Sequence, residues 1–286
     1  MAALLVYLEA PFAAFRTFTA GWYRPTATFL TPSAAYGLLL NIAGIESRLR
    51  EGEIGHDDGT PASLTRLGLP AAEIAIGSPT FRLRGRTREP ILETEMFPRV
   101  QSVFQQLHNY PVGKGNKVND PDNPEKKVYQ VQLAERRSQG SKPNIAPVRR
   151  EFLTDLRAVI AVKTDAATED RIRRGLGTDP PSPDGQPRYG VPFLGDNAFL
   201  LDRLEELNEP GPVRWFEQIT ADSPGGVRER ATRLTILIDR ADLSRTTSAL
   251  FAPGDPQTEP PVLAWTGINP PPIPPSPPPT TKRGKK

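Results

Sequence analysis

Apolar residues near the start of the chain follow two patterns, and each predicts a different element. The run Leu4–Leu8 is apolar and β-compatible, as expected of a strand that is buried on both faces, and Pro11 is expected to end it. A helix is then expected over 32–44, because Thr31 can cap it and Pro32 suits its first position. The apolar face of this helix has the spacing i, i+3, i+4 and i+7, in Ala35, Leu38, Leu39 and Ile42.

The rest of the chain has weaker patterns of the same two kinds. Extended runs predict strands at residues 73–77, 80–87, 128–133, 149–162, 213–219 and 233–239. Asp165 begins a second helix, which ends at Gly175 or Gly177. Two shorter helices are expected at residues 101–107 and 200–207.

The order of the main elements predicts the fold class. Strand, helix, strand, strand, helix and a last strand at 233–239 make an α+β protein with a ferredoxin-like, RNA-recognition-motif-like βαββαβ core. Basic segments around a flexible loop predict a long β-hairpin insertion over about 82–150, which includes Lys114 and Lys117. We expect one domain over 1–260 with an irregular C-terminal extension. A proline-rich, basic tail over 261–286 is expected to be disordered in the isolated protein.

The net charge of +3 is concentrated in the middle of the chain. Residues 82–150 contain 14 Lys and Arg against 7 Asp and Glu, whereas the segments on either side are each slightly acidic. This uneven charge is typical of a protein with a polyanionic partner. The sequence contains no cysteine, and no apolar run approaches the roughly 20 residues that span a bilayer. We therefore expect a cytoplasmic protein without a membrane partner.

Four arginines recur at every second residue of the predicted strand at 80–87 and just beyond it: Arg82, Arg84, Arg86 and Arg88. This spacing places four guanidinium groups on one face, where they repel one another unless an anion neutralises them. Because the guanidinium fork suits phosphate, we predict that these residues bind RNA. The alternative is an edge strand that its charge protects from aggregation.

A loop between the first predicted strand and the first predicted helix carries aromatic and arginine residues: Arg16, Trp22, Tyr23 and Arg24. Aromatic faces and guanidinium planes hold unstacked bases, and the N–H groups at a helix N-terminus, here near Ser33, stabilise phosphate. We predict that this loop and the helix start form a seat for RNA. The alternative is that the aromatic residues belong to the core and the arginines are solvated.

Three residues near the predicted insertion allow a catalytic hypothesis: His108, Tyr110 and Lys114. A metal-independent ribonuclease can use histidine as general base, tyrosine as a proton donor and lysine to stabilise the phosphate. A lone histidine at the end of a short helix is the better-supported interpretation. No Walker A loop, dinucleotide fingerprint or carboxylate pattern for two metals occurs, so we expect no catalysis, no cofactor and no metal.

Two stretches carry a resemblance to a known family. The first contains Glu9-Ala10-Pro11, Phe15-Arg16, Pro32-Ser33-Ala34, Tyr36-Gly37-Leu38-Leu39 and Gly44-Ile45, and the second is Gly190-Val191-Pro192-Phe193-Leu194-Gly195-Asp196. Together they resemble the signatures of the CRISPR-associated Cas-five family of the RAMP superfamily. Both stretches stand in the family's order, which suggests that the resemblance covers roughly residues 3 to 250.

This resemblance implies a RAMP-type domain with a thumb hairpin, in parts of 95–145, that presses on the guide RNA. It implies a non-catalytic, RNA-binding subunit of a type I (Cascade) ribonucleoprotein complex in antiviral defence. Such a subunit caps the five-prime handle of the guide RNA, contacts the backbone and large subunits, and meets target DNA indirectly. Two alternatives remain: an endoribonuclease that processes precursor guide RNA, and an adaptor whose proline tail binds aromatic-lined grooves.

Overall fold

A computed structural model of the chain describes most of its residues: 3–17, 23–49, 64–85, 89–92, 97–108, 116–130, 132–133, 145–177, 191–209, 211–220, 229–240 and 243–270. The chain divides into two compact units. The larger unit, called the body, comprises Met1–Phe15, Ala27–Arg99 and Leu153–Lys286. The smaller, called the insertion unit, comprises Arg16–Thr26 and Val100–Phe152.

A large sheet organises the described residues, and its main path runs in the order β10-β1-β9-β3-β11-β13-β12. Every pair along this path is antiparallel. Three further strands join it, because β14 pairs with β3, while β2 and β6 each pair with β9. The bounds of these strands are β1 Leu4–Ala13, β2 Tyr23–Arg24, β3 Ala72–Pro79, β6 Arg99–His108, β9 Ile145–Thr164, β10 Arg203–Glu206, β11 Val213–Gln218, β12 Thr232–Leu237, β13 Thr247–Gln257 and β14 Thr266–Ile268.

The remaining elements are two separate hairpins and the helices. The hairpins are β4 (Phe81–Arg84) with β5 (Glu89–Leu92), and β7 (Lys117–Asp120) with β8 (Asn123–Tyr129). The helices are α1 (Pro32–Ile42), α3 (Ala166–Leu176) and the 3-10 turns η1 (Leu243–Arg245) and η2 (Val262–Ala264). The α+β class is therefore confirmed. No helix among the described residues is long and apolar enough to cross a membrane.

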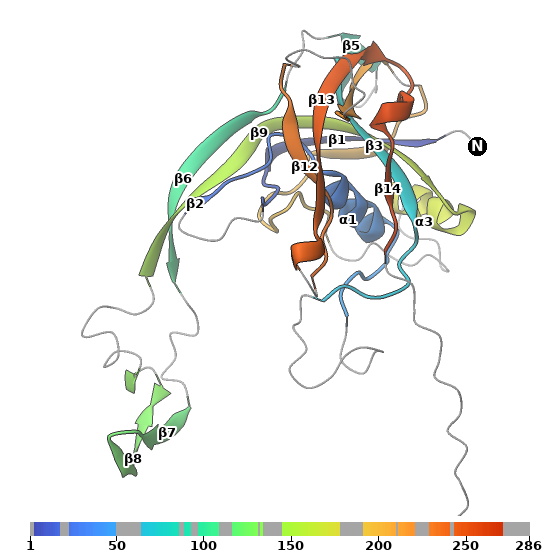
Figure 1. Cartoon of the computed structure of the whole chain (residues 1–286). Helices are drawn as coiled ribbons and strands as arrows, with labels where there is room; N and C mark the ends of the chain where they lie inside the picture. Colours follow the sequence, from blue (N-terminus) through green and yellow to red (C-terminus); the bar gives the residue numbers. More distant parts are fainter. Residues whose placement is uncertain are drawn as a thin grey trace, which may run out of the picture. The chain divides into compact units, whose positions relative to one another are not determined.

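Helices α1 and α3 lie together on one face of the body sheet (Figure 1). Their starts are as predicted: the Thr31 hydroxyl accepts a hydrogen bond from the backbone N–H of Ala34, and the Asp165 carboxylate accepts one from Thr168. The four apolar residues predicted for the first helix are buried. On α3, the Arg171 guanidinium donates to the carbonyl oxygens of residues 43 and 44, which satisfies acceptors at the end of α1.

The opposite face of the body sheet is also covered. Trp215, Tyr7 and Phe81 form a second apolar cluster there, in which the rings of Tyr7 and Phe81 stack at 5.9 Å between centroids. The first strand is therefore buried on both faces, as predicted. It does not end at Pro11, however, because pairing with β9 continues on both sides of that residue. Proline has no N–H to donate, but its fixed φ is compatible with an extended chain.

Both predicted short helices are wrong. Residues 101–107 lie in strand β6, and the segment 200–207 contains strand β10, which pairs with β1. Leu204 packs in the cluster on the helix side, while Leu207 packs in the cluster on the other face, so side chains of this segment serve both faces of the sheet. Pairing with β1 and β9 thus overrides the local helical spacing.

The position of the predicted last strand is also corrected. The run at 233–239 does form a strand, β12, but it pairs with β13, and the strand beside β1 is β10. The C-terminal extension is less irregular than expected, because β13 and β14 both belong to the large sheet. Ile268 in β14 is fully buried, so the predicted start of the tail at residue 261 is too early.

Candidate nucleic-acid interface

Strand β2 of the insertion unit brings an aromatic ring beside an arginine. Tyr23 pairs in parallel with Arg149 on β9, and the Arg149 guanidinium lies 5.6 Å from the centre of the Tyr23 ring. The ring is 46% exposed, and the guanidinium also donates to the Ser102 hydroxyl of β6 at 3.3 Å. A cation against an aromatic face is a stabilising pair, and both planes can still stack on an unpaired base.

Glu151 holds this arrangement in place. One of its carboxylate oxygens accepts a short hydrogen bond from the Tyr23 hydroxyl, and the other accepts from the backbone N–H of Thr26 at 3.2 Å. The hydrogen bond to Glu151 raises the pKa of Tyr23, because the carboxylate stabilises the neutral phenol. Glu151 thereby fixes both ends of the segment 23–26 on β9.

The two other predicted arginines of this loop lie in the same unit. The backbone of Arg16 forms an isolated antiparallel β-bridge with that of Thr26, and the backbone of Arg24 pairs with that of Arg150 in the β2–β9 ladder. Among the described residues, neither Arg16 nor Arg24 has an ion pair with a carboxylate. We call Arg16, Tyr23, Arg24 and Arg149 the β2–β9 patch. Because successive side chains of a strand point to opposite faces, Tyr23 and Arg149 share one face of the β2–β9 ladder, and Arg24 projects from the other face.

The insertion unit carries the positive charge of the protein. Its sequence contains 11 Lys and Arg against 5 Asp and Glu, a net charge of +6, whereas the body contains 25 against 28, or −3. The aromatic side chain of Phe104 on β6 is 77% exposed. Positive charge and exposed aromatic rings in one small unit are the features by which proteins bind single-stranded nucleic acid.

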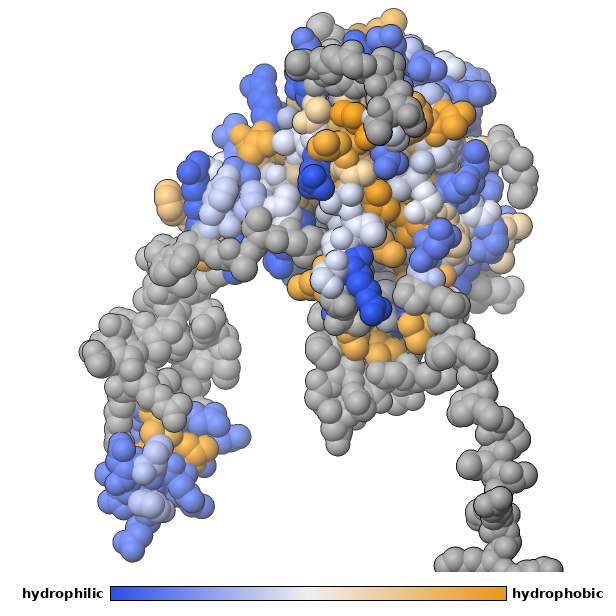
Figure 2. Space-filling view, viewed as in Figure 1, coloured by the Kyte–Doolittle hydropathy of each residue, from blue (hydrophilic) through white to orange (hydrophobic). Residues whose placement is uncertain are grey.

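The hairpin of β7 and β8 adds further lysines to the insertion unit. Lys117 is exposed, and its ammonium group lies 5.2 Å from the centre of the Tyr129 ring. Lys126 and Lys127 on β8 are exposed as well. Figure 2 shows this hairpin as a mostly hydrophilic surface. Such side chains can bind phosphate without sequence preference.

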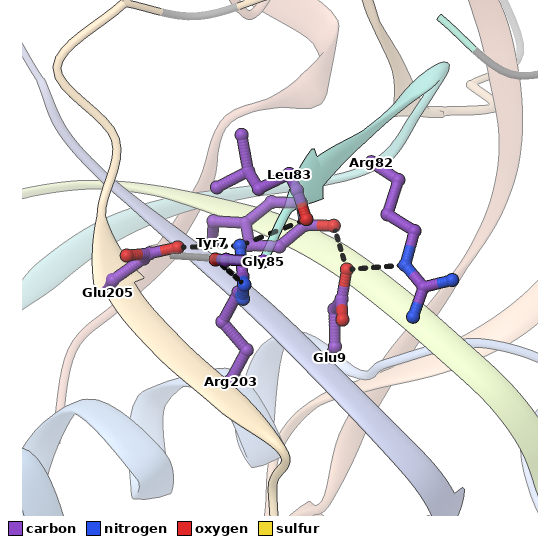
Figure 3. A network of polar contacts seen from close by, with 7 residues as sticks. All are labelled: Tyr7, Glu9, Arg82, Leu83, Gly85, Arg203 and Glu205. Atoms are coloured by element: carbon purple, nitrogen blue, oxygen red, sulfur yellow. Dashed lines mark hydrogen bonds and ion pairs between the residues drawn. The ribbon is translucent and has the colours of Figure 1, made fainter. Parts of the chain in front are cut away.

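The body presents a different arginine arrangement on β4. Arg82 and Arg84 are exposed while Phe81 and Leu83 are buried, which confirms the predicted alternation for these two of the four arginines. The Arg82 guanidinium already has an ion pair, because its Nε lies 3.5 Å from a carboxylate oxygen of Glu9, whose side chain is only 12% exposed. The Tyr7 hydroxyl donates to the same carboxylate oxygen at 2.6 Å (Figure 3).

A second arginine attaches the β4 segment to the sheet. Arg203 of β10 donates to the carbonyl oxygens of Leu83 at 3.1 Å and Gly85 at 2.5 Å, and lies 3.3 Å from Glu205 (Figure 3). These bonds satisfy carbonyl groups at and just after β4. These hydrogen bonds attach β4 to the sheet of the body. The ion pairs of Arg82 and Arg203 show that part of the local positive charge is already neutralised by carboxylates.

The start of α1 is less open than the sequence suggested. The Thr31 hydroxyl caps the N–H of Ala34, and the Ser33 hydroxyl lies 3.1 Å from that of Thr31. Ser33 belongs to the body and the β2–β9 patch to the insertion unit, so the predicted joint seat stays a prediction.

Other predicted residues lie outside the described part of the chain: Trp22, Arg86, Arg88, Tyr110 and Lys114. His108 is the last residue of β6, and its side chain is likewise outside the description. Within the described residues, no three His, Asp or Glu side chains gather in a way that could hold a metal ion.

Sequence reasoning missed Arg149, Glu151 and Ser102. The predicted strand at 149–162 includes two of these residues, but its apolar pattern indicates only a core strand. A signal was present, since Arg149-Arg150-Glu151 is a charged start to an otherwise apolar strand. The pairing of this start with the aromatic loop is a long-range interaction that no local pattern indicates.

The second family-like stretch forms a tight turn in the body. Gly195 has φ +77°, and a Cβ there would lie 1.7 Å from the carbonyl oxygen of Ala14. The Ala14 N–H donates to the Leu194 carbonyl at 3.1 Å, and the Asp196 carboxylate accepts from the N–H of Ala198. This turn therefore has a structural role against β1.

The described residues thus define an α+β protein that combines a large, mostly antiparallel sheet with a separate cationic unit. A family model described as "CRISPR-associated protein (Cas_Cas5)" matches residues 3–177, more than half of the chain. The protein belongs to this family, which confirms the resemblance seen in the first stretch. The matched residues end before the second stretch at 190–196, so the predicted coverage to about residue 250 stays a prediction.

Two solved structures are similar in outline. One, named "CRISPR RNA-guided surveillance complex", contains a chain that is 13% identical, with a TM-score of 0.47 and coverage of 90% of this chain and 92% of that one. The other, "Crystal structure of Cas protein", is 12% identical, with a TM-score of 0.36 and coverage of 88% and 95%. None of the curated proteins matches the chain.

Proposed function

We propose that this protein is a non-catalytic, RNA-binding subunit of a type I CRISPR (Cascade) surveillance complex. In this proposal it holds the five-prime handle of the guide RNA and contacts the backbone and large subunits. Membership of the CRISPR-associated family supports the assignment to a CRISPR complex. The observation that carries the RNA-binding role is the β2–β9 patch, where the exposed Tyr23 ring and the Arg149 guanidinium lie together in the cationic unit.

The chemistry of this patch suits a single-stranded RNA end. Bases at such an end are unstacked and can stack on the Tyr23 ring or on guanidinium planes. Phosphates between these bases can accept hydrogen bonds from Arg16, Arg24 and Arg149. The exposed lysines of the β7–β8 hairpin then bind the backbone farther along. Base pairing in the guide reads the target, so the protein has only to fix the handle in register.

A binding experiment tests this proposal. Handle RNA is titrated into the full-length protein and into Tyr23→Ala, Arg16→Ala, Arg24→Ala and Trp22→Ala variants, with circular dichroism to check folding. Removal of one base-stacking aromatic residue is expected to weaken binding by about 1–3 kcal/mol. If all four variants bind like the parent, the handle is held elsewhere.

A cleavage assay separates this role from guide processing. Repeat RNA incubated with the protein in the presence of a chelator is expected to stay intact, because we assign binding and not catalysis to the insertion unit. Cleavage that is abolished in a His108→Ala variant would instead support the endoribonuclease hypothesis.

The fold supports a finer proposal about the core. We propose that β1, α1, β3, β9, α3 and β10 form a ferredoxin-like βαββαβ unit. In support, these elements follow one another in that order, and their strands are adjacent in the antiparallel order β10-β1-β9-β3. In this arrangement β11, β12, β13 and β14 extend the core sheet.

A further inference from the structure

A polar cavity of about 460 Å³ opens in the body beside strands β11 and β13. This volume lies in the range of sites that bind small ligands. Its lining combines the guanidinium groups of Arg214 and Arg230 with the carboxylates of Glu217, Glu229 and Asp255. The cavity belongs entirely to the body, so its ligand does not depend on the β2–β9 patch.

An irregularity in the β11–β13 ladder creates the cavity wall. Arg214 pairs with Pro256 and Phe216 with Pro253, so two residues of β13, Gly254 and Asp255, face the single residue between them on β11. Such a bulge re-aims side chains and is common beside binding sites. The Arg214 guanidinium is fixed to the bulge, because it donates to the carbonyl oxygen of Gly254 at 3.1 Å.

Glycine at position 254 leaves room for an acidic side chain. A Cβ there would lie 2.3 Å from a carboxylate oxygen of Glu217, so any larger residue must displace that side chain. The glycine has no positive φ that would explain its presence. The bulge therefore brings the Gly254 backbone beside the Glu217 carboxylate and holds the Arg214 guanidinium at the Gly254 carbonyl, and both side chains line the cavity.

Arg230 forms another part of the wall in an uncommon backbone conformation. Its φ of 58° lies in the left-handed region, which non-glycine residues seldom adopt and which points to a functional constraint. Its guanidinium group lies 4.2 Å from the centre of the Phe97 ring. A guanidinium group supported on one side by an aromatic ring offers its opposite face to a second flat group.

The mixture of charges restricts the ligand. Three carboxylates against two guanidinium groups disfavour a ligand that is held by its phosphate alone, and the described residues hold no metal-binding cluster here. The edge of a nucleobase carries hydrogen-bond donors and acceptors side by side, so a site that binds it must offer both kinds of group. Guanine has two adjacent N–H groups that can donate to one carboxylate. It also has the O6 and N7 acceptors, which arginine binds in bidentate fashion. Adenine, cytosine and uracil do not present both patterns.

We propose that this cavity binds a guanine base, supplied either by an unpaired nucleotide of an RNA strand or by a free guanosine nucleotide. Glu217 or Asp255 accepts from the N1 and N2 donors of the base, and Arg214 donates toward its acceptors. The base stacks on the exposed face of Arg230. No bond is made or broken, so the site is one of recognition.

The test uses full-length protein and equilibrium dialysis with guanosine, adenosine, cytidine and uridine monophosphates. Guanosine monophosphate is expected to bind at least about tenfold more tightly than the other three, the ratio expected of one good bidentate interaction. Equal affinity for all four, or no binding of any nucleotide even when a guanine is placed within a short single-stranded RNA, would overturn the proposal. Binding of guanine only within the RNA would identify the strand as the source.

Three variants and a control make this test specific. Gly254→Ala should fold normally, because only the end of a flexible side chain has to move, and it should abolish the preference for guanine if Glu217 is the acceptor, since the new Cβ displaces that side chain. Asp255→Asn should lower affinity for guanosine monophosphate about tenfold if Asp255 is the acceptor, and Glu217→Gln should do so if Glu217 is. Arg233→Ala, on β12 where the side chain contacts Ser248, should have no effect. Unchanged guanine preference in Gly254→Ala, Asp255→Asn and Glu217→Gln alike would contradict the assignment.

Discussion

The β4 strand of the body and the β2–β9 patch of the insertion unit both display arginine, but the partners of these arginines differ. Arg82 on β4 pairs with the largely buried carboxylate of Glu9, which also accepts from Tyr7. Arg149 on β9 contacts an aromatic ring and a hydroxyl group, and the nearby Glu151 is occupied by the hydroxyl and amide of residues 23 and 26. Arginine spacing alone therefore does not identify a phosphate site; the local partner does.

The largest effect is expected from a change in the body that leaves the insertion unit untouched. Gly195→Ala places a Cβ against the Ala14 carbonyl in a left-handed conformation. We expect it to lower the free energy of unfolding by about 2–5 kcal/mol, from strain and overpacking together. Urea unfolding measures this decrease.

A matched glycine variant is the control for that measurement. Gly37 lies within α1, and a Cβ there meets no atom within 4 Å. Gly37→Ala should raise the stability by about 0.5–1 kcal/mol, since glycine is costly inside a helix. Equal effects of the two variants would show that the turn at Gly195 is not held against β1.

The next largest effect is expected in RNA binding. Arg149→Ala removes both the charge and the planar group beside Tyr23, and Tyr23→Ala removes the ring. Each should weaken the binding of single-stranded RNA by about 1–3 kcal/mol and lower the stability only slightly, because the contact between the two side chains is exposed. Arg149→Lys should restore the charge without the planar surface and give an intermediate affinity, measured by filter binding. Full affinity in Tyr23→Ala would show that the ring does not stack on a base.

Alkaline pH should destabilise the body through its buried tyrosines. Burial raises the pKa of Tyr7, with a further contribution from its hydrogen bond to Glu9, and burial likewise raises the pKa of Tyr36. An unfolded tyrosine ionises near pH 10, so above that pH the unfolded chain loses protons that the folded chain retains. The free energy of unfolding should fall by up to about 1.4 kcal/mol per pH unit for each group. In Tyr7→Phe, the free energy of unfolding, measured with urea between pH 9 and 11, should fall less steeply with pH, because one of the two tyrosine contributions is absent. The same dependence on pH as in the parent protein would contradict the contribution of Tyr7.

The smallest effect is expected at Arg82. Because its side chain is half exposed, the ion pair with Glu9 should contribute no more than about 1 kcal/mol to stability. Arg82→Ala should therefore unfold nearly like the parent protein. It should also change RNA affinity little, because Arg82 is already engaged by a carboxylate. A marked decrease of RNA affinity in Arg82→Ala would mean that the pair with Glu9 opens to admit phosphate.

The sequence predicts the elements whose signals are local. Thr31-Pro32 and Asp165 mark helix starts, and the apolar runs around Val6 and Ile160 mark strands that are buried on both faces. Each of these elements depends on its own residues, so its pattern can be recognised without knowledge of the partners.

Long-range strand pairing determines the elements that local sequence patterns predicted wrongly or not at all. The segments 101–107 and 200–207 have helical spacing but become β6 and β10, because β9 and β1 offer them unpaired strand edges. The proline-containing strand β13 has no regular alternation that would have predicted it. At the candidate site, the aromatic and arginine residues of the loop are enough to single out Tyr23 as a candidate. Arg149 lies more than one hundred residues away in the sequence and is brought beside Tyr23 by the parallel β2–β9 pairing.

The salt dependence of RNA affinity in two matched double variants tests the central claim most directly. Arg24→Ala/Arg149→Ala and Arg82→Ala/Arg84→Ala each remove two positive charges, the first from the β2–β9 patch and the second from β4. The slope of log affinity against log salt should flatten by about 1.4 in the first variant, because each single-strand phosphate that the protein neutralises accounts for about 0.7 of the slope. In the second it should flatten by less than in the first, because Glu9 already neutralises Arg82. An equal or larger change in the β4 variant would show that the RNA lies on the body and not on the β2–β9 patch.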